Sequence, residues 1–170
     1  NKAIIGGNFC RWYGGFDSYI VAQEFNCPLW APSMGRKIEG EEQVPDLEHL
    51  PFMPWGQWMY KLAEFKYAIH LMQTFAAGSF MLNCAYLGIP CIGYNRVDTQ
   101  RNLFPDLSIE IDDLDSARKL ANKLVNDKDF YTHCSSTAKS LYQKHYSEKA
   151  FSNWKNEFFP NIDNFIKDWK

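Results

Sequence analysis

QTFAAGSFMLNCAYLGIPCIGYN, residues 73–95, is the stretch that decides the fold of this chain. It predicts the end of one strand, a turn of small residues, a nearly all-apolar helix over 79–87 and another strand over 90–94. A helix of this composition must be buried on most of its sides. Two buried strands joined by a helix form a parallel βαβ unit, so the turn before the helix lies at the carboxyl edge of the sheet.

Patterns on both sides of this unit extend it to an α/β domain. Strands are expected over residues 2–8, 28–34, 49–55, 67–72, 90–94 and 107–111, and residues 35–46 are expected to form an exposed loop. Helices are expected over residues 57–65 and 79–87, after caps at Asp17-Ser18 and at Asp112 or Asp113, and over 130–146, 148–159 and 161–170. The fold class is therefore α/β, a Rossmann-like three-layer αβα domain with a parallel sheet of five or six strands plus C-terminal helices.

Composition narrows the classes of protein to consider. The chain has 170 residues, of which 46% are hydrophobic, so it has enough apolar side chains for one folded domain. Its net charge is −2 and its basic residues are scattered, which argues against a nucleic-acid-binding surface. No apolar run approaches the roughly 20 residues of a membrane span, and the N-terminus lacks a signal-peptide pattern. Five cysteines without metal or redox spacing indicate buried thiols of a cytoplasmic protein.

Five candidate binding residues follow strands at the expected carboxyl edge. Gly7 ends the first strand, Gln73 and Thr74 follow the strand over 67–72, and Gly78 and Ser79 open the apolar helix. Glycine lets the backbone approach a phosphate, and the first N–H groups of a helix have no internal partner. A hydroxyl at Ser79 or Thr74 would add a donor. An ordinary tight turn between a strand and a helix is the alternative interpretation of the same residues.

Four further candidates each have a functional and a structural interpretation. Asn83 is the clear polar exception in the apolar helix, so it needs either a ligand hydroxyl or a backbone group as partner. Arg36 and Lys37 either neutralise a pyrophosphate or belong to a solvated loop. Trp55 either stacks on a nucleotide base or serves as a core or lid residue.

Other features that look chemical have structural explanations. The acidic run Asp112–Asp115 stands at a helix start, where capping explains it. His70 lies inside an apolar strand, which favours a core histidine with satisfied hydrogen bonds. The remaining histidines have no metal-ligand spacing, and no P-loop, G-x-S-x-G or G-x-G-x-x-G motif occurs. We therefore expect no metal site and assign no catalytic residue.

The sequence over about residues 1–159 resembles the C-terminal, donor-binding half of a GT-B glycosyltransferase. The family segment reads small-Gly-x-x-x-x-Glu-Ala-x-x-x-Gly-x-Pro, and here it stands as Gly78, Asn83, Cys84, Gly88, Ile89 and Pro90. The closing pattern is also similar, with Val125-Asn126-Asp127, Phe130-Tyr131, Tyr146-Ser147-Glu148 and Phe151. The chain departs from the family at Asn83, where an acidic residue usually reaches the ribose, and near Phe75, where another acidic residue would fall.

The resemblance implies a donor-binding domain over 1–159 and a helical tail over 160–170, with the N-terminal acceptor domain absent from this chain but expected to pack on it. It implies a glycosyltransferase, of hexosyltransferase type, that binds a nucleoside-diphosphate sugar without a cofactor, transfers it to an unknown acceptor and is poorly active as this fragment. The alternatives are a non-catalytic flavodoxin-like module that binds a nucleotide or a protein, and half of a sugar-nucleotide epimerase. Exposed apolar surface on the C-terminal helices would distinguish a severed half from a lone module.

Overall fold

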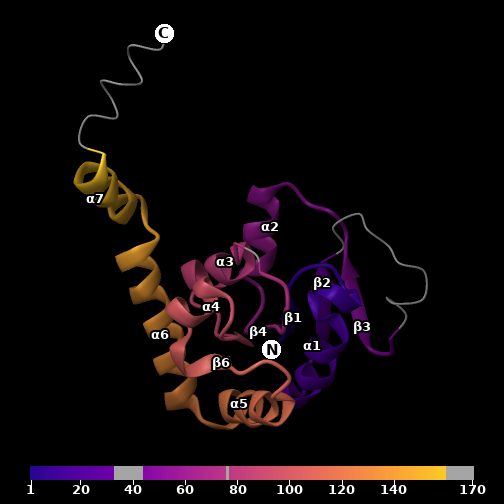
Figure 1. The fold of residues 1–170 in the computed structure, drawn as a ribbon. Helices are drawn as coiled ribbons and strands as arrows, with labels where there is room; N and C mark the ends of the chain where they lie inside the picture. The colour runs from indigo at the N-terminus through magenta and orange to yellow at the C-terminus, as the bar shows by residue number, and fades with distance from the viewer. Residues whose placement is uncertain (33–43, 76, 160–170) are drawn as a thin grey trace.

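The computed structural model describes residues 1–32, 44–75 and 77–159, and these form the expected α/β domain (Figure 1). Its six-stranded sheet is built from β1 (Ala3–Ile5), β2 (Leu29–Pro32), β3 (Leu47–Leu50), β4 (Tyr67–His70), β5 (Cys91–Tyr94) and β6 (Ser108–Ile109). Every neighbouring pair is parallel. The predicted fold class, a Rossmann-like parallel sheet with flanking and C-terminal helices, is confirmed.

The strand order is β3-β2-β1-β4-β5-β6. The chain therefore runs outward from β1 to β3, then returns to place β4 on the other side of β1. Ile5 pairs with Ile69 at this junction, and the Gly6 N–H donates to the Ile69 carbonyl over 2.8 Å. In open parallel sheets a reversal of this kind opens a crevice at the carboxyl ends of the two strands, where ligands bind.

Helices cover both faces of the sheet (Figure 1). One face carries α1 (Gly15–Ala22) and α5 (Leu114–Asn126), which pack against each other. The other face carries α2 (Trp55–Leu62), α3 (Ser79–Leu87), α4 (Asp98–Leu103) and α6 (Lys128–His145). Three short 3₁₀ helices lie at Arg11–Tyr13, Gln23–Phe25 and Pro105–Leu107. The last described helix, α7 (Glu148–Phe158), follows α6 and extends away from the sheet.

The helix ends show where the sequence pattern succeeded and where it failed. As predicted, an aspartate caps α5: the Asp113 carboxylate accepts a hydrogen bond from the Ser116 N–H over 3.0 Å. The predicted cap at Asp17-Ser18 is wrong, because α1 begins at Gly15 behind Gly14, whose φ is 67°. Ser18 instead lies buried inside α1, and its hydroxyl accepts a hydrogen bond from the Leu71 N–H over 2.9 Å.

Three other element predictions need correction. The strand expected over 49–55 is β3, which begins at Leu47 and ends before Pro51, so Trp55 starts α2 instead of ending a strand. The short polar helix α4 was not predicted. The bounds of α3 are confirmed, but α3 is buried on one side only, since 54% of Tyr86 is exposed. The expected tail helix over 161–170 and most of the loop over 35–46 lie outside the described residues.

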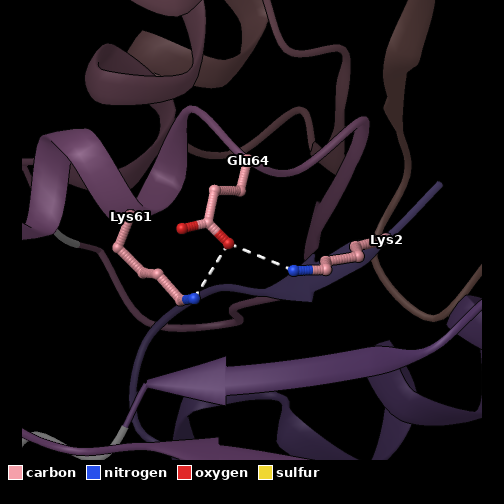
Figure 2. A network of polar contacts seen from close by, with 3 residues as sticks. All are labelled: Lys2, Lys61 and Glu64. Carbon is pink, nitrogen blue, oxygen red and sulfur yellow. Dashed lines mark hydrogen bonds and ion pairs between the residues drawn. The ribbon is translucent and has the colours of Figure 1, made fainter.

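Three residues tie the end of α2 to β1 (Figure 2). The Glu64 carboxylate accepts from Lys61 Nζ at 2.9 Å and from Lys2 Nζ at 3.1 Å, and these hydrogen bonds lower the pKa of Glu64. Both lysines also lie over the Trp30 ring, with Lys61 Nζ 5.5 Å and Lys2 Nζ 5.7 Å from its centroid. An exposed ion pair contributes little stability, so this network mainly orients α2 on the sheet. Within the described residues, no helix has the length and apolar character needed to cross a membrane.

Candidate functional site

The start of α3 lies at the carboxyl edge, as the sequence predicted. Gly78 adopts φ 67°, and the first intrahelical bond runs from the Leu82 N–H to the Gly78 carbonyl over 3.1 Å. The three preceding N–H groups of α3 therefore have no partner in the helix itself, and Ser79 is exposed beside them. Their orientation and the helix dipole favour an anion at this position.

The reason for glycine at position 78 is packing as well as conformation. A Cβ atom on Gly78 would lie 1.7 Å from Thr99 Oγ1 and 3.2 Å from Val97 Cγ1. Gly78 is buried because the loop between β5 and α4 lies directly against the start of α3. This packing agrees with the tight-turn interpretation of Gly78, and the anion-site interpretation stays a prediction.

Gln73 and Thr74 are exposed at the same edge, but their donor groups already have partners. Gln73 Nε2 donates to Asp112 Oδ1 over 2.9 Å, and Thr74 Oγ1 donates to the Trp12 carbonyl over 3.2 Å. These bonds connect the loop after β4 to the segments after β1 and β6. These bonds hold both side chains in place, and they use the single donor of Thr74 and one of the two amide N–H donors of Gln73.

Gly7 lies at the end of β1 with φ 71°, directly against His70. A Cβ atom at Gly7 would come within 2.9 Å of His70 Nε2. His70 is the last residue of β4, and its ring meets Phe80 edge-on at 5.6 Å. The prediction of a satisfied core histidine is wrong: the ring is buried, but neither nitrogen has a hydrogen-bond partner among the described residues. Burial lowers the pKa of His70 to about 4, so the ring is neutral at neutral pH.

Trp55, the first residue of α2, and Asn83, one turn into α3, line a groove between these two helices that the end of α6 closes. The groove has a volume of about 820 Å³ and is lined by Trp55, Gly56, Met59, Tyr60, Ala63, Leu82, Asn83, Tyr86, Leu87, Tyr142 and Tyr146. None of these side chains is charged. Asn83 is half-buried, and its amide makes no hydrogen bond to any other described residue. The backbone partner that sequence reasoning allowed for Asn83 is therefore absent from the described part of the chain.

Helix α3 connects the groove to the edge. Ser79 and Asn83 are four residues apart, so they share one face of α3 and are separated by about 6 Å along its axis. Tyr86 continues this face by another turn. A ligand whose anionic group rests on the first turn of α3 can thus extend along Asn83 toward Trp55.

Arg36 and Lys37 lie outside the described residues. The structure places a different cation at the edge: Arg96, two residues after the end of β5, whose guanidinium carbon lies 4.3 Å from the centroid of the exposed Phe75 ring. Arg96 forms no ion pair with another described residue. Sequence reasoning missed it, although its place shortly after a buried strand was the available signal.

The opposite side of the edge carries negative charge. Asp17 in the first turn of α1 is partly buried, and burial together with the Asp112 charge raises its pKa. Burial, followed by the Asp17 charge, raises the pKa of the buried Tyr94 phenol to about 12. Two carboxylates here disfavour an anion beside α1, whereas Arg96 favours one beside α3. Among the described residues, no three His, Cys, Asp or Glu side chains are arranged to hold a metal ion.

Solved structures share this fold at low sequence identity. A point mutant of S. aureus TarM, in complex with fondaparinux, α-GlcNAc-glycerol and UDP, superposes with a TM-score of 0.70 at 15% identity, covering 93% of this chain and 35% of that one. Sucrose-phosphate synthase from Thermosynechococcus elongatus has a TM-score of 0.71 at 10% identity, with coverage of 96% and 45%. Anabaena HepE in complex with UDP-glucose has a TM-score of 0.66 at 11% identity, with coverage of 84% and 44%.

Neither a protein-family profile nor a curated protein sequence matches this chain. The chain spans between a third and a half of the length of the three structures above. The fold expected from the resemblance, a Rossmann-like parallel α/β domain, is confirmed. Identity of 10–15% establishes the fold alone.

Proposed function

We propose that this chain is the donor-binding domain of a glycosyltransferase and binds a nucleoside-diphosphate sugar. The observation that carries the proposal is the continuous path along α3, from unpaired N–H groups at the sheet edge to the unpaired Asn83 amide in the groove. A pyrophosphate suits the first position, and a ribose with its hydroxyls suits the second. TarM and HepE, which share the fold, bind UDP and UDP-glucose.

Different residues of the site bind different parts of the nucleotide sugar. The first turn of α3 and Ser79 hold the pyrophosphate, and Arg96 supplies a positive charge beside it. Asn83 hydrogen-bonds the ribose, and Trp55, 71% exposed at the start of α2, stacks on the base. When the glycosyl bond breaks, negative charge grows on the departing diphosphate, and the same N–H groups and cation stabilise that charge. The transferred sugar is a hexose in this proposal, and the catalytic base lies outside this domain.

A second domain completes the proposed enzyme. Helix α7 leaves the body of the domain and exposes 61% of Phe151, 48% of Trp154 and 46% of Phe159. The rings of Phe151 and Trp154 stack at 6.0 Å, and Phe159 meets Trp154 edge-on at 5.3 Å. An aromatic face of this kind favours packing against another domain, and the resemblance suggests the acceptor domain. A lone flavodoxin-like module that binds only a nucleotide has no use for this face.

Thermal denaturation with UDP, GDP, ADP and UDP-glucose tests the donor site. A nucleotide that binds only the folded chain raises its melting temperature by mass action. We expect one of these ligands to do so, and Ser79→Asp to abolish the shift, because a carboxylate would then occupy the anion position. The same carboxylate favours the helix N-terminus, so the variant should remain folded.

Thr132→Asp, an exposed substitution in the first half of α6, is the matched control. The neighbouring Tyr131 hydroxyl donates to the Lys66 carbonyl, just before β4, so this control lies at the opposite edge of the sheet. It should leave the nucleotide shift unchanged. Asn83→Leu should reduce the rise in melting temperature for each nucleotide whose ribose Asn83 contacts. A shift that survives Ser79→Asp unchanged would place the nucleotide elsewhere and refute the proposed site.

A further inference from the structure

We infer that the lower part of the groove between α2 and α3 is a separate binding site for a neutral oligosaccharide. This part lies beyond Asn83, away from the sheet edge, and its walls are Met59 and Tyr60 of α2, Tyr86 of α3 and Tyr142 of α6. Tyr86 lies nearly one turn of α3 beyond Asn83, where the ribose is proposed to bind, so this part of the groove does not require a nucleotide. Its ligand would be a glycan bound beside the donor site.

The absence of charge in the groove determines the charge of the ligand. Its lining contains aromatic, aliphatic and amide side chains together with one glycine, and no lysine, arginine, aspartate or glutamate. A charged ligand would lose its hydration there without gaining an opposite charge. The occupant is therefore neutral. The whole groove, including the part beside Trp55 and Asn83, has a volume of about 820 Å³, which lies within the range of sites that bind small ligands.

The aromatic rings determine the shape of the ligand. Tyr60 is 84% exposed and Tyr86 is 54% exposed, so their ring faces are available to a ligand. Tyr142 meets Tyr86 edge-on, with centroids 5.5 Å apart and planes at 69°, which holds the Tyr86 ring in one orientation. A sugar ring presents flat patches of C–H groups that pack on such faces and bury apolar surface.

The polar atoms exclude a purely aliphatic ligand. The hydroxyls of Tyr60, Tyr86 and Tyr142 make no hydrogen bond to other described residues, and the Asn83 amide adds an unpaired donor and acceptor above them. An alkyl chain would bury these groups without partners, at a cost for each of them. An oligosaccharide offers hydroxyls at its ring edges in addition to its apolar faces, and so satisfies both kinds of surface.

NMR titration of the ¹⁵N-labelled chain with maltotriose, chitotriose and decanoate, each up to about 20 mM, tests this inference. We expect at least one trisaccharide to shift amide signals of α2 and α3 with saturation, and Tyr60→Ala or Tyr86→Ala to weaken binding about fivefold or more. Both side chains are more than half exposed, so the variants should keep their melting temperature. Phe52→Ala, at an exposed aromatic residue outside the groove, should bind like the parent chain.

Three outcomes would overturn the inference: no saturable shift with either trisaccharide, shifts that Tyr60→Ala and Tyr86→Ala leave intact, or binding of decanoate alone. The last outcome would identify an aliphatic ligand. The donor-site proposal is judged separately by the nucleotide melting shift and its loss in Ser79→Asp. Each of the two proposals can therefore fail while the other stands.

Discussion

At the end of β4, the polar side chains on the two faces of the sheet differ in their hydrogen bonding. On the face covered by α1 and α5, the polar side chain that reaches this point is Ser18, and it accepts a hydrogen bond from the Leu71 N–H. On the face covered by α2 and α3, the corresponding side chain is His70, and neither of its nitrogens is paired within the described residues. The first face is closed by direct helix packing, and the second contains the groove. The unpaired His70 ring and the open groove thus lie on the same side of the sheet, where a ligand is proposed to bind.

The closed face should be the more sensitive to added volume. A Cβ atom on Gly14 would lie 1.8 Å from the Leu71 carbonyl oxygen, at a φ of 67° that disfavours L-residues. Because neither backbone can move without breaking the contact of α1 with β4, we expect Gly14→Ala to destabilise the fold by about 3 kcal/mol or more. Chemical denaturation measures the loss.

Gly56 in α2 is the matched position on the open face. A Cβ atom there meets nothing within 4 Å, so Gly56→Ala should raise the free energy of unfolding by about 0.5 kcal/mol through helix propensity. Equal destabilisation by the two substitutions would show that the faces do not differ in packing.

His70 should make the open face sensitive to acid. Its pKa is about 4 in the folded chain against 6.5 for an ordinary histidine, so the unfolded chain takes up a proton first as the pH falls. The folded state should therefore lose about 3 kcal/mol between pH 6.5 and 4 relative to a chain without this histidine. His70→Leu should remove this part of the pH dependence, measured by urea denaturation at several pH values.

His133→Gln, at an exposed residue of α6, is the control for this slope. It should keep the pH dependence of the parent chain. If His70→Leu and the parent chain lose stability in parallel with falling pH, His70 is paired or hydrated in solution and the contrast between the faces weakens.

Ser18 tests the closed face by removing one acceptor. Ser18→Ala leaves the buried Leu71 N–H without a partner, which should cost about 1–2 kcal/mol in the free energy of unfolding. Ser136→Ala removes a comparable hydroxyl from the exposed surface of α6 and should change stability by less than about 0.5 kcal/mol. Similar costs for the two substitutions would mean that burial does not strengthen the Ser18 bond.

Local patterns were sufficient where a side chain acts on its own segment. The bounds of α3, the Asp113 cap of α5 and the alternation of strands and helices all follow from turns, caps and hydrophobic periodicity close in sequence. The short helix α4 could not be found this way. Its Gln100 is buried because Nε2 donates to the carbonyls of Cys91 and Leu107, so the helix depends on the neighbouring strand β5 and on the 3₁₀ helix before β6.

The candidate site likewise combines features that follow from local sequence with features that depend on tertiary contacts. The sequence by itself determined the parallel sheet and the exposed first turn of α3, because small residues before an apolar helix produce that geometry wherever they occur. Only the tertiary structure decided that Trp55 and Asn83 share a groove, that Arg96 stands beside α3, and that Gln73 and Thr74 each donate a hydrogen bond to another segment. Each of these depends on which segments the strand order makes neighbours, and no local pattern encodes contacts between residues far apart in the chain.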